Sequence, residues 1–552
     1  MGVQKTRFGE PLQVQLKSAT TTLIVEPTQG FALNQPETDL LPGQTPDCVN
    51  FLMKDGALQL RPTLSRYTSN ENPVGPMTGG YTVVSSVGSF YPLVSGATQI
   101  AYYSAGSWSS PLSYVSAAGA STPPSGNSLD FTDITQVYDP NTDDMVAVVA
   151  YQSYQTLLVW KSGATIFSSI TSAPRAKYVA SFDNFLLALN VRDVGSGESA
   201  YVQRVQWSDR GDPLSWKPGS ASLAGFEDLL DAKGAGTRLI VSDNLVYIFF
   251  EDEIWQGTRA TGTSSFAFSA LDRSIGSPYP WTIVQTPLGI FFLGRDLNVY
   301  LLPKGSGQAN PVGYQVQRKI KARINNPERA WALWDGDTTT YQLWFPVRGG
   351  SGTAQEALFL NIADNCYAPQ TVVHATGNFS LHRGFVAYNS SLQNSITWAD
   401  LQTAGVTWAS LSSSWADFAG SSSFAGRVVA AGNSSGTMYY FSGGTTDDGV
   451  GIGARWRSAA LGPDGPEAVK VLQEVRVDYQ SGSESTVAIR ASRDQGSTYD
   501  NAQIVTLAQS NQQNSAVAHL YTVARYPTFE VQVNSQSAKL YRFWAKFRTG
   551  GR

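Results

Sequence analysis

The sequence has little cysteine, little histidine and no long apolar run. Cys48 and Cys366 are the only cysteines among 552 residues. Two thiols cannot form a disulfide framework or a cysteine-only zinc site, so we interpret them as separate buried thiols, with one bridge as the alternative. The three histidines, His374, His382 and His519, match no metal-ligand spacing. We therefore expect neither a metal site nor a cofactor. No stretch of 18 apolar residues occurs, so we expect no membrane anchor.

Charge is also scarce. Only 15% of residues are charged, and 39 Lys and Arg against 43 Asp and Glu leave a formal net charge of −4. A composition with 42% hydrophobic and 12% aromatic residues excludes a disordered chain. The mild acidity argues against a protein that binds nucleic acid tightly, because tight binding needs clustered Lys and Arg. No apolar segment follows Lys5 and Arg7, so we expect synthesis in a cytoplasm without a secretory signal.

Helical periodicity is nearly absent. Short helical turns are predicted only at 225–233 and 327–334. Elsewhere the pattern consists of short β-branched or aromatic runs bounded by Gly, Asn, Asp or Pro, and the chain holds 51 Gly and 27 Pro. This pattern is typical of strands joined by turns and predicts an all-β fold.

A longer rhythm is superimposed on the strands. Pairs of strands turn near residues 96, 140, 184, 244, 288, 336, 384 and 434, which are 44 to 60 residues apart. Such spacing, with several strands per unit, is typical of β-propeller blades, and it predicts six to eight of them. A β-sandwich, the alternative for this region, would place turns every 8–12 residues without a longer period.

Three domains are predicted. Residues 1–75 are rich in Pro and Thr and are interpreted as an extended N-terminal arm with a hairpin at 54–57, where Asp-Gly supplies the turn. Residues 76–448 are assigned to the β-propeller. Residues 449–552 contain strands in which apolar and charged residues alternate, as in sheets with one buried and one wet face. They are predicted to form a C-terminal β-sandwich.

Few segments carry recognisable chemistry. No G-x-S-x-G nucleophile motif occurs. The only dense basic run consists of Arg318, Lys319, Lys321 and Arg323. Its alternation with other residues favours one solvated strand face, and a nucleic-acid patch facing a channel is the alternative. Residues 492–499 match the Asp-box pattern S-x-D-x-G-x-T-[WY], which we interpret as a hairpin turn rather than a glycosidase signature.

The most individual segment is the loop from Trp207 to Trp216. It combines a tryptophan at a strand edge, an Asx-type turn, a rigid Asp-Pro step and a second tryptophan that can fold back onto the first. None of its residues is an obvious acid, base or nucleophile. We interpret it as a packed structural motif made by Trp207, Ser208, Asp209, Asp212, Pro213 and Trp216.

This loop resembles a signature of the tail nozzle, or tail tubular protein B-like, proteins of short-tailed bacteriophages, which act in packaged-DNA stabilisation and as tail hubs. Further segments are similar to that family. In the arm they are 41–51 (LPGQTPDCVNF), 55–58 (DGAL) and 61–62 (RP), and later in the chain they are 225–229 (GFEDL), the apolar strand pair at 239–255, and 289–296 (GIFFLGRD). Leu297 stands where the family pattern has a final Gly. The matches are short and scattered over the chain.

The resemblance implies a virion structural protein of the tail and not an enzyme, with no catalytic or cofactor-binding residue. Such proteins form a ring, commonly a hexamer, below the portal and the head–tail adaptor ring. The ring encloses and gates the DNA exit channel used in DNA ejection, and tail fibres or tailspikes attach to it. Packaged DNA would pass without sequence-specific binding, since a near-neutral to acidic lining adds little affinity for phosphates.

Two other classes of protein stay open. A propeller-type glycan-binding or glycan-hydrolysing protein would need clustered carboxylates or three arginines in a central pocket, which a sequence does not exclude. A bacterial surface or adhesion module is disfavoured by the missing export signal.

Overall fold

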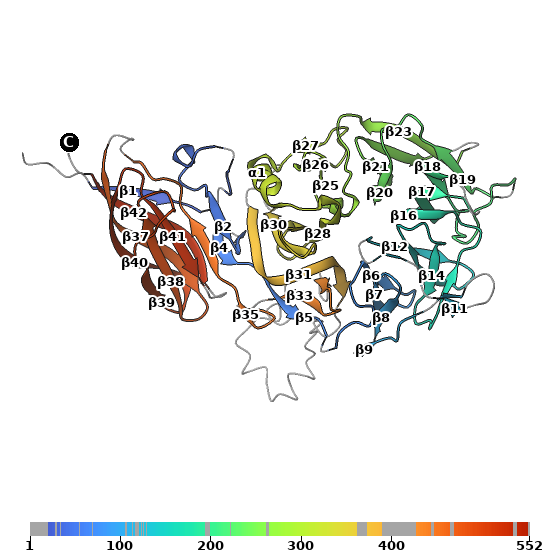
Figure 1. Cartoon of the computed structure of the whole chain (residues 1–552), viewed down its shortest axis with the longest axis horizontal. Helices are drawn as coiled ribbons and strands as arrows, with labels where there is room; N and C mark the ends of the chain where they lie inside the picture. Colours follow the sequence, from blue (N-terminus) through green and yellow to red (C-terminus); the bar gives the residue numbers. More distant parts are fainter. Residues whose placement is uncertain are drawn as a thin grey trace, which may run out of the picture. The chain divides into compact units, whose positions relative to one another are not determined.

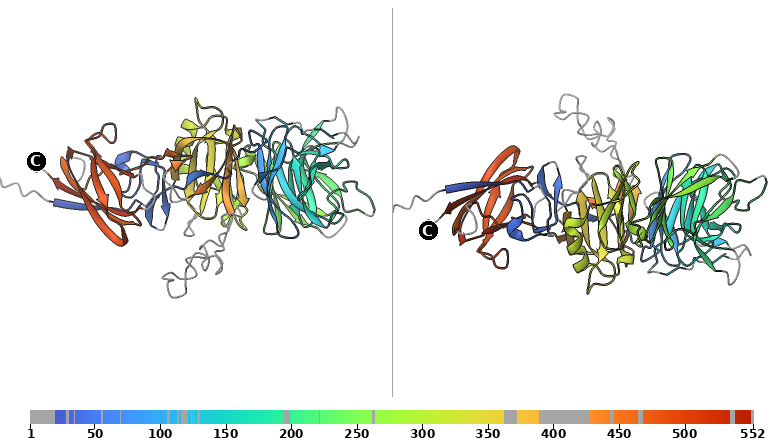
Figure 2. Two further views of the ribbon diagram at one scale, coloured as in Figure 1. Left: turned by 90° about the horizontal axis from the view of Figure 1, so that it is seen from below. Right: turned by 90° about the horizontal axis from the view of Figure 1, so that it is seen from above.

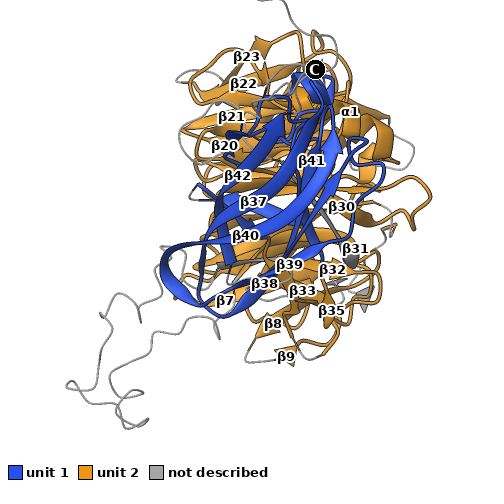
Figure 3. Ribbon diagram, turned by 90° about the vertical axis from the view of Figure 1, so that its left-hand side faces the viewer, with its two compact units in different colours: residues 1–60, 453–552 blue, residues 61–452 orange. Residues whose placement is uncertain are grey.

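The computed structural model describes most of the chain in two compact units. It describes residues 20–27, 30–33, 35–54, 56–68, 70–104, 107–112, 114–115, 121–122, 124, 126–127, 130–193, 199–220, 222–260, 264–361, 372–388, 427–442, 446–463, 468–533 and 538–549. Unit 1 comprises residues 1–60 and 453–552, and unit 2 comprises residues 61–452 (Figure 3). The propeller is unit 2, and the β-sandwich is unit 1.

The described strands of unit 2 form seven blades, in which almost all strand pairs are antiparallel. Blade 1 contains β6 (Gly79–Val84), β7 (Phe90–Ser95), β8 (Ile100–Ser104) and β9 (Ser107–Trp108). Blade 2 contains β12 (Asp133–Asp139), β13 (Asp144–Ala150), β14 (Leu158–Lys161) and β15 (Phe167–Ser169), with β10 (Tyr114–Val115) and β11 (Ser121–Thr122) added at its edge. Blade 3 contains β16 (Arg175–Phe182), β17 (Phe185–Arg192), β18 (Ala200–Trp207) and β19 (Gly225–Asp228).

The remaining blades follow in chain order. Blade 4 contains β20 (Gly236–Ser242), β21 (Leu245–Phe250), β22 (Ile254–Arg259) and β23 (Phe266–Asp272). Blade 5 contains β24 (Val284–Thr286), β25 (Gly289–Leu293), β26 (Val299–Pro303) and β27 (Asn310–Pro311). Blade 6 contains β28 (Trp331–Asp335), β29 (Thr340–Pro346), β30 (Ala354–Asn361) and the first part of β31 (Val372–Tyr388). Blade 7 contains the second part of β31, β32 (Arg427–Asn433), β33 (Met438–Ser442) and β5 (Thr63–Arg66).

The blades close into a ring around one axis (Figure 1). The first strand of each blade contacts the first strand of the next, from β6 through β12, β16, β20, β24 and β28 to β31, and β31 contacts β6. Blade 7 is completed by β5, which comes from the beginning of unit 2 and pairs with β33. The two ends of the unit are therefore joined within one blade, and Figure 2 shows the blades from the side.

The core of unit 2 lies between neighbouring blades. One apolar cluster joins Val146 and Val148 of blade 2 to Val179 and Leu186 of blade 3. Similar clusters lie between blades 1 and 2, between blades 4 and 5, and between blades 7 and 1. Blades 1 and 2 thus bury apolar residues on both faces. Strands such as β17 and β29 are buried along nearly their whole length, as their continuous apolar runs require.

Several predicted turns are present as expected. Asp183 and Asn184 join β16 to β17 with φ of 47° and 61°, and Asp243 and Asn244 join β20 to β21 with φ of 51° and 62°. Asp and Asn tolerate this left-handed conformation, which two-residue hairpins require. The turn predicted near residue 384 is absent, because Gly384 lies inside β31. A Cβ there would meet Trp331 at 2.5 Å, so this glycine serves close packing.

The helical predictions differ from the structure. Residues 225–233 were expected to be helical, but Gly225–Asp228 forms β19 and pairs with β18. The segment at 327–334 contains the short 3-10 helix η3 (Pro327–Arg329) followed by β28. Two more 3-10 helices are η1 (Glu37–Asp39) and η2 (Pro280–Thr282). Within the described ranges α1 (Tyr314–Arg323) is the one α-helix, and no helix has the length and apolar character to cross a membrane.

Unit 1 is a sandwich of two antiparallel sheets. One sheet contains β1 (Thr20–Val25), β3 (Phe51–Lys54), β4 (Ala57–Leu60), β37 (Lys470–Ser481), β40 (Ser510–Ala524) and β42 (Ala538–Thr549). The other contains β2 (Asp47–Val49), β36 (Ala454–Arg457), β38 (Ser485–Ser492), β39 (Gln503–Leu507) and β41 (Thr528–Val533). Trp456, Phe529 and Phe543 pack between the sheets with ring centroids 5.2 to 5.8 Å apart.

The N-terminal segment contributes to both units. The sequence placed residues 1–75 in one extended arm, whereas β1 to β4 belong to the sandwich and β5 belongs to blade 7. The hairpin predicted at 54–57 joins β3 to β4, although Asp55 lies outside the described residues. Cys48 is fully buried in β2, and Cys366 lies outside the described residues.

Candidate functional site

The two tryptophans of the predicted loop pack on opposite sides of blade 3. Trp207 is 3% exposed, and its ring lies 5.0 Å from that of Phe266 in blade 4. Trp216 is 2% exposed and belongs to the apolar cluster between blades 2 and 3. The second indole therefore does not fold back onto the first. Instead the loop from β18 to β19 connects three successive blades.

The polar residues of this loop are used to hold its shape. Oγ of Ser208 accepts a hydrogen bond from the amide of Leu186 at 3.0 Å. Oδ1 of Asp209 accepts from the amide of Leu223 at 2.9 Å, and Oδ1 of Asp212 accepts from that of Leu214 at 3.0 Å. The carbonyl of Pro213 accepts from Trp216 Nε1 at 2.9 Å. These bonds fix the backbone.

The basic run at Arg318, Lys319, Lys321 and Arg323 lies on α1 and not on a strand. Its buried residues, Val316 and Ile320, are four positions apart, which is the spacing of one helix face. The interpretation as a strand face is therefore wrong, because the alternation of charged and apolar residues is too short to separate the two periods. Arg323 is paired with Glu356, whereas the side chains of Arg318 and Lys321 are exposed.

The first strands of the blades bring together charged residues at the propeller axis that lie far apart in the sequence. Asp133 begins β12, Arg238 lies near the start of β20, and Arg383 lies in β31. Nη1 of Arg238 lies 3.3 Å from Oδ1 of Asp133. Both guanidinium groups contact the ring of Trp281 in η2, with Cζ 4.6 Å from its centroid for Arg238 and 4.5 Å for Arg383. We call these four residues the axis cluster.

Burial dominates the electrostatics of the axis cluster. Burial raises the pKa of Asp133, although Arg238 and the amide of Val179 favour its charged form. Burial, with repulsion from Arg238, lowers the pKa of Arg383 to about 9, and Asp133 opposes this shift. Phe131 and Tyr178 pack against Trp281 at 5.7 and 6.0 Å. The cluster therefore places two cations and one carboxyl group in an aromatic setting.

A second unusual surface lies on unit 1. The side chains of β40 alternate, and Val517, Tyr521 and Val523 point away from the sandwich core with exposed fractions of 42, 64 and 50%. Val471 lies beside Val523 on β37, and Val469 just before it is also exposed. We call these five residues the apolar edge patch. A sheet face that meets only water is normally polar, so such a patch indicates an interaction surface.

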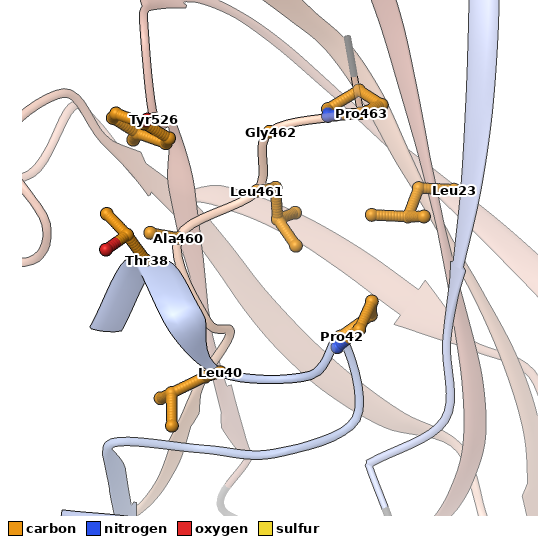
Figure 4. A pocket seen from close by; sticks show the side chains of 9 residues that line it. All are labelled: Leu23, Thr38, Leu40, Pro42, Ala460, Leu461, Gly462, Pro463 and Tyr526. Atoms are coloured by element: carbon orange, nitrogen blue, oxygen red, sulfur yellow. The ribbon is translucent and has the colours of Figure 1, made fainter. Parts of the chain in front are cut away.

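Unit 1 also contains a hollow of about 300 Å³ between its N-terminal and C-terminal segments. Leu23, Pro42 and Leu461 face one another across it (Figure 4). Its other lining residues are Thr38, Leu40, Ala460, Gly462, Pro463 and Tyr526. This lining has no carboxylate, histidine or cation, so the hollow offers shape and apolar contact and little acid–base chemistry.

Sequence reasoning missed both the axis cluster and the apolar edge patch. The members of the axis cluster are brought together only by ring closure, which no local pattern contains. The patch had a local signal, since apolar residues at 517, 521 and 523 fall on the same side of a strand that carries polar residues elsewhere. Within the described residues no three His, Cys, Asp or Glu side chains are placed to hold a metal.

Comparison with known proteins finds similar chains only among solved structures. No family profile matches the sequence, and no curated protein matches it. Among solved structures, a fungal alcohol oxidase of the AA5 family in complex with copper is similar, with 10% identity, a TM-score of 0.39, and coverage of 88% of this chain and 98% of that chain. An exo-β-1,3-galactanase from Phanerochaete chrysosporium has 10% identity, a TM-score of 0.26, and coverage of 88% and 99%.

A third similar structure is YCF48 bound to a D1 peptide, with 10% identity, a TM-score of 0.35, and coverage of 69% of this chain and 99% of that chain. At such identities the likeness concerns the fold, and no site residue is carried over. The expectation that the chain is not an enzyme is nevertheless contradicted, because these propeller-type neighbours include an alcohol oxidase and a galactanase. The fold class does not exclude catalysis.

Proposed function

We propose that this protein is a structural component of a phage tail, a ring-forming nozzle or hub that lies below the portal and the head–tail adaptor ring. Copies of the chain would enclose and gate the DNA exit channel. The proposal rests on the sequence resemblance described above and on one structural observation, the apolar edge patch on an open sheet edge of unit 1. That observation supports self-association.

β40 combines two features of an association surface. It is 15 residues long, and among the described residues it forms a strand ladder only with β37, so its other edge has no paired strand. An unpaired edge offers main-chain hydrogen bonds to another chain, and natural monomers usually protect it with charge, Pro or a bulge. The pairing of β40 with β37 does contain two register irregularities, but β40 also exposes valine and tyrosine side chains on its outer face. We infer that a second copy covers this edge.

The other side of the same sheet has a different edge. β42 pairs with β37 on one side and with β1 and β4 on the other, so β1 and the β3–β4 hairpin form the far edge. The two edges have unlike sequences. Contact between unlike surfaces of identical chains is head-to-tail. It generates a closed ring when the rotation that relates successive copies brings the last copy into contact with the first. A hexamer is the ring size that the resemblance implies.

The glycan alternative has less support from the propeller axis. A glycan-hydrolysing site of the kind considered above needs a carboxylate pair or three arginines. Within the described residues the axis cluster supplies two arginines and one carboxyl group. We therefore keep the tail component as the proposed function and assign no surface to the adaptor or to tail fibres.

The first test is the mass of the purified chain. We expect a ring in solution. Tyr521→Lys should raise the dissociation constant of each contact between copies about 30-fold. Burying a lysine in place of a central aromatic side chain removes at least ~2 kcal/mol of binding free energy per contact. Light scattering and electron micrographs report the mass and the ring. Leu230→Lys is the matched control, since Leu230 is 78% exposed on the propeller. A monomer at all protein concentrations would contradict the proposal.

The second test is DNA binding. The net charge of −4 leaves no cationic surplus, so we expect weak binding to linear duplex, with a shallow loss of affinity between about 50 and 200 mM salt. If α1 faces the channel, the double variant Arg318→Gln with Lys321→Gln binds duplex DNA more weakly still. Its affinity also falls less steeply as the salt concentration rises. Electrophoretic mobility and anisotropy measure both quantities. Sub-micromolar, salt-steep binding by a stable monomer would indicate a nucleic-acid-binding protein instead.

A further inference from the structure

We propose that the axis cluster is a binding site for a carboxylate group, held by Arg238 and Arg383 beside Trp281. Such a site belongs to the propeller itself and does not depend on the proposed role in a phage tail. The argument rests on unpartnered donors, on charge balance and on the rigidity of the cluster.

The two guanidinium groups have donors without partners. Nε and Nη1 of Arg238 and Nη1 of Arg383 are buried and make no hydrogen bond to any described residue. Nη1 of Arg238 is near Asp133 but lacks hydrogen-bond geometry. Buried donors are nearly always satisfied in native proteins. Nε of Arg238 and Nη1 of Arg383, which have neither a hydrogen bond nor an ion-pair contact, therefore point to an acceptor that binds there. Access is available, because 18% of the Arg238 side chain is exposed and Arg383 is half-buried.

Charge balance selects the kind of acceptor. Burial raises the pKa of Asp133, but the charges of Arg238 and Arg383 favour its ionised form. With Asp133 ionised, the two guanidinium groups leave a single positive charge in the cluster. A monoanion neutralises it, whereas a phosphate dianion would exceed it and repel the carboxylate of Asp133. Guanidinium donors in a planar fork match the two oxygens of a carboxylate. The geometry therefore favours a carboxylate over a doubly charged oxyanion.

The cluster is held in place by rigid elements. The indole of Trp281 contacts both guanidinium planes, and such cation–π contacts orient arginines without using their hydrogen-bond donors. The neighbouring Thr282 is fixed by a bond from the hydroxyl of Tyr341 to its carbonyl at 2.8 Å. Arg238 and Arg383 extend from first strands of their blades. A site built on strands is pre-organised, which reduces the entropy lost on binding.

The arrangement lowers the stability of the unliganded protein. Burial and repulsion from Arg238 lower the pKa of Arg383 to about 9, so its charged form is disfavoured in the folded state. Below about pH 9 the charged Arg383 therefore lowers the free energy of unfolding. This loss disappears as the pH rises from about 9 towards the pKa that arginine has in the unfolded chain. An apolar residue of similar size would avoid it. A buried charge that costs stability indicates a role in binding.

The experiment measures the thermal unfolding midpoint of the full chain in sodium acetate and in sodium chloride at equal ionic strength, together with calorimetric titration of acetate. We expect acetate to raise the midpoint of the wild type. In chloride, Arg383→Met should have a higher unfolding midpoint than the wild type. It should lose the response to acetate, and its calorimetric affinity for acetate should be reduced about tenfold or more. Arg318→Gln, which removes an exposed charge from the same unit, should behave like the wild type.

Two further arms decide the ligand class. For each anion, the rise of the unfolding midpoint in the wild type is compared with the rise in Arg383→Met. We expect this difference to be smaller in sulfate and in inorganic phosphate than in acetate at the same ionic strength. Equal midpoints of the wild type in acetate and chloride, an unchanged acetate response in Arg383→Met, or tighter binding of phosphate than of acetate would each overturn the assignment. If Arg383→Met fails to fold, Arg238→Met gives the same comparison.

Discussion

Replacing Trp216 with alanine is expected to lower the free energy of unfolding of the propeller by about 3–5 kcal/mol. The indole is 2% exposed and belongs to the apolar cluster between blades 2 and 3, which also contains Val146, Val179 and Leu186. Alanine would leave a cavity that the flanking sheets cannot close without moving whole blades. Urea unfolding followed by circular dichroism measures the loss.

Two variants separate packing from other effects. Leu230→Ala changes a side chain that is 78% exposed in the next connection, between β19 and β20, and it should alter stability by less than about 0.5 kcal/mol. Trp216→Phe keeps an aromatic ring but loses the Nε1 bond to the carbonyl of Pro213, so an intermediate loss is expected. A Trp216→Ala protein as stable as Leu230→Ala would contradict the role of this indole as a wedge between blades.

The turns were predictable because their chemistry is local. Asp-Asn pairs at 183–184 and 243–244 adopt the left-handed conformation that two-residue hairpins need, and the sequence alone contains that preference. The blade period follows from these turns. Gly384 shows the limit of such local prediction. Glycine is a typical turn residue, but Gly384 lies inside β31 and allows close packing against Trp331, a contact that forms only when the ring does.

The helices were less predictable. α1 is ten residues long, and only Val316 and Ile320 mark its buried face, so its period is hard to distinguish from strand alternation. Gly225–Asp228 has acidic and apolar residues suited to a helical turn, but pairing with β18 determines its conformation. Tertiary pairing overrides weak local preference in such short segments.

The axis cluster and the closure of the ring depend on long-range contacts. Asp133, Arg238 and Arg383 belong to blades 2, 4 and 7, and only the shared axis brings them together. Likewise the sequence placed residues 63–66 in the N-terminal arm, whereas β5 completes blade 7. A strand that pairs across nearly the whole length of the propeller leaves no local signal.

An ion pair reinforces this closure. Arg61 and Asp447 lie near the two ends of unit 2, and their side chains are 0% and 1% exposed. Nη2 of Arg61 donates to Oδ2 at 2.6 Å and Nη1 donates to Oδ1 at 3.2 Å. Oδ1 of Asp447 also accepts from the amide of Leu64 at 2.9 Å, at the second residue of β5. One carboxylate thus holds both the arginine and the closing strand.

Asp447→Ala is expected to cost about 3–5 kcal/mol of propeller stability, because it leaves the guanidinium of Arg61 buried without its carboxylate. Hydrogen exchange should show the loss first in β5 and β33, since the amide of Leu64 loses its acceptor as well.

The neighbouring pair of Arg66 and Asp448 is the matched control. Its side chains are 55% and 33% exposed, so Asp448→Ala should cost at most about 1 kcal/mol. The double variant Arg61→Met with Asp447→Leu removes both charges and should recover most of the stability lost in Asp447→Ala. Equal losses in Asp447→Ala and Asp448→Ala, with unchanged exchange in β5, would mean that strand pairing alone closes the ring.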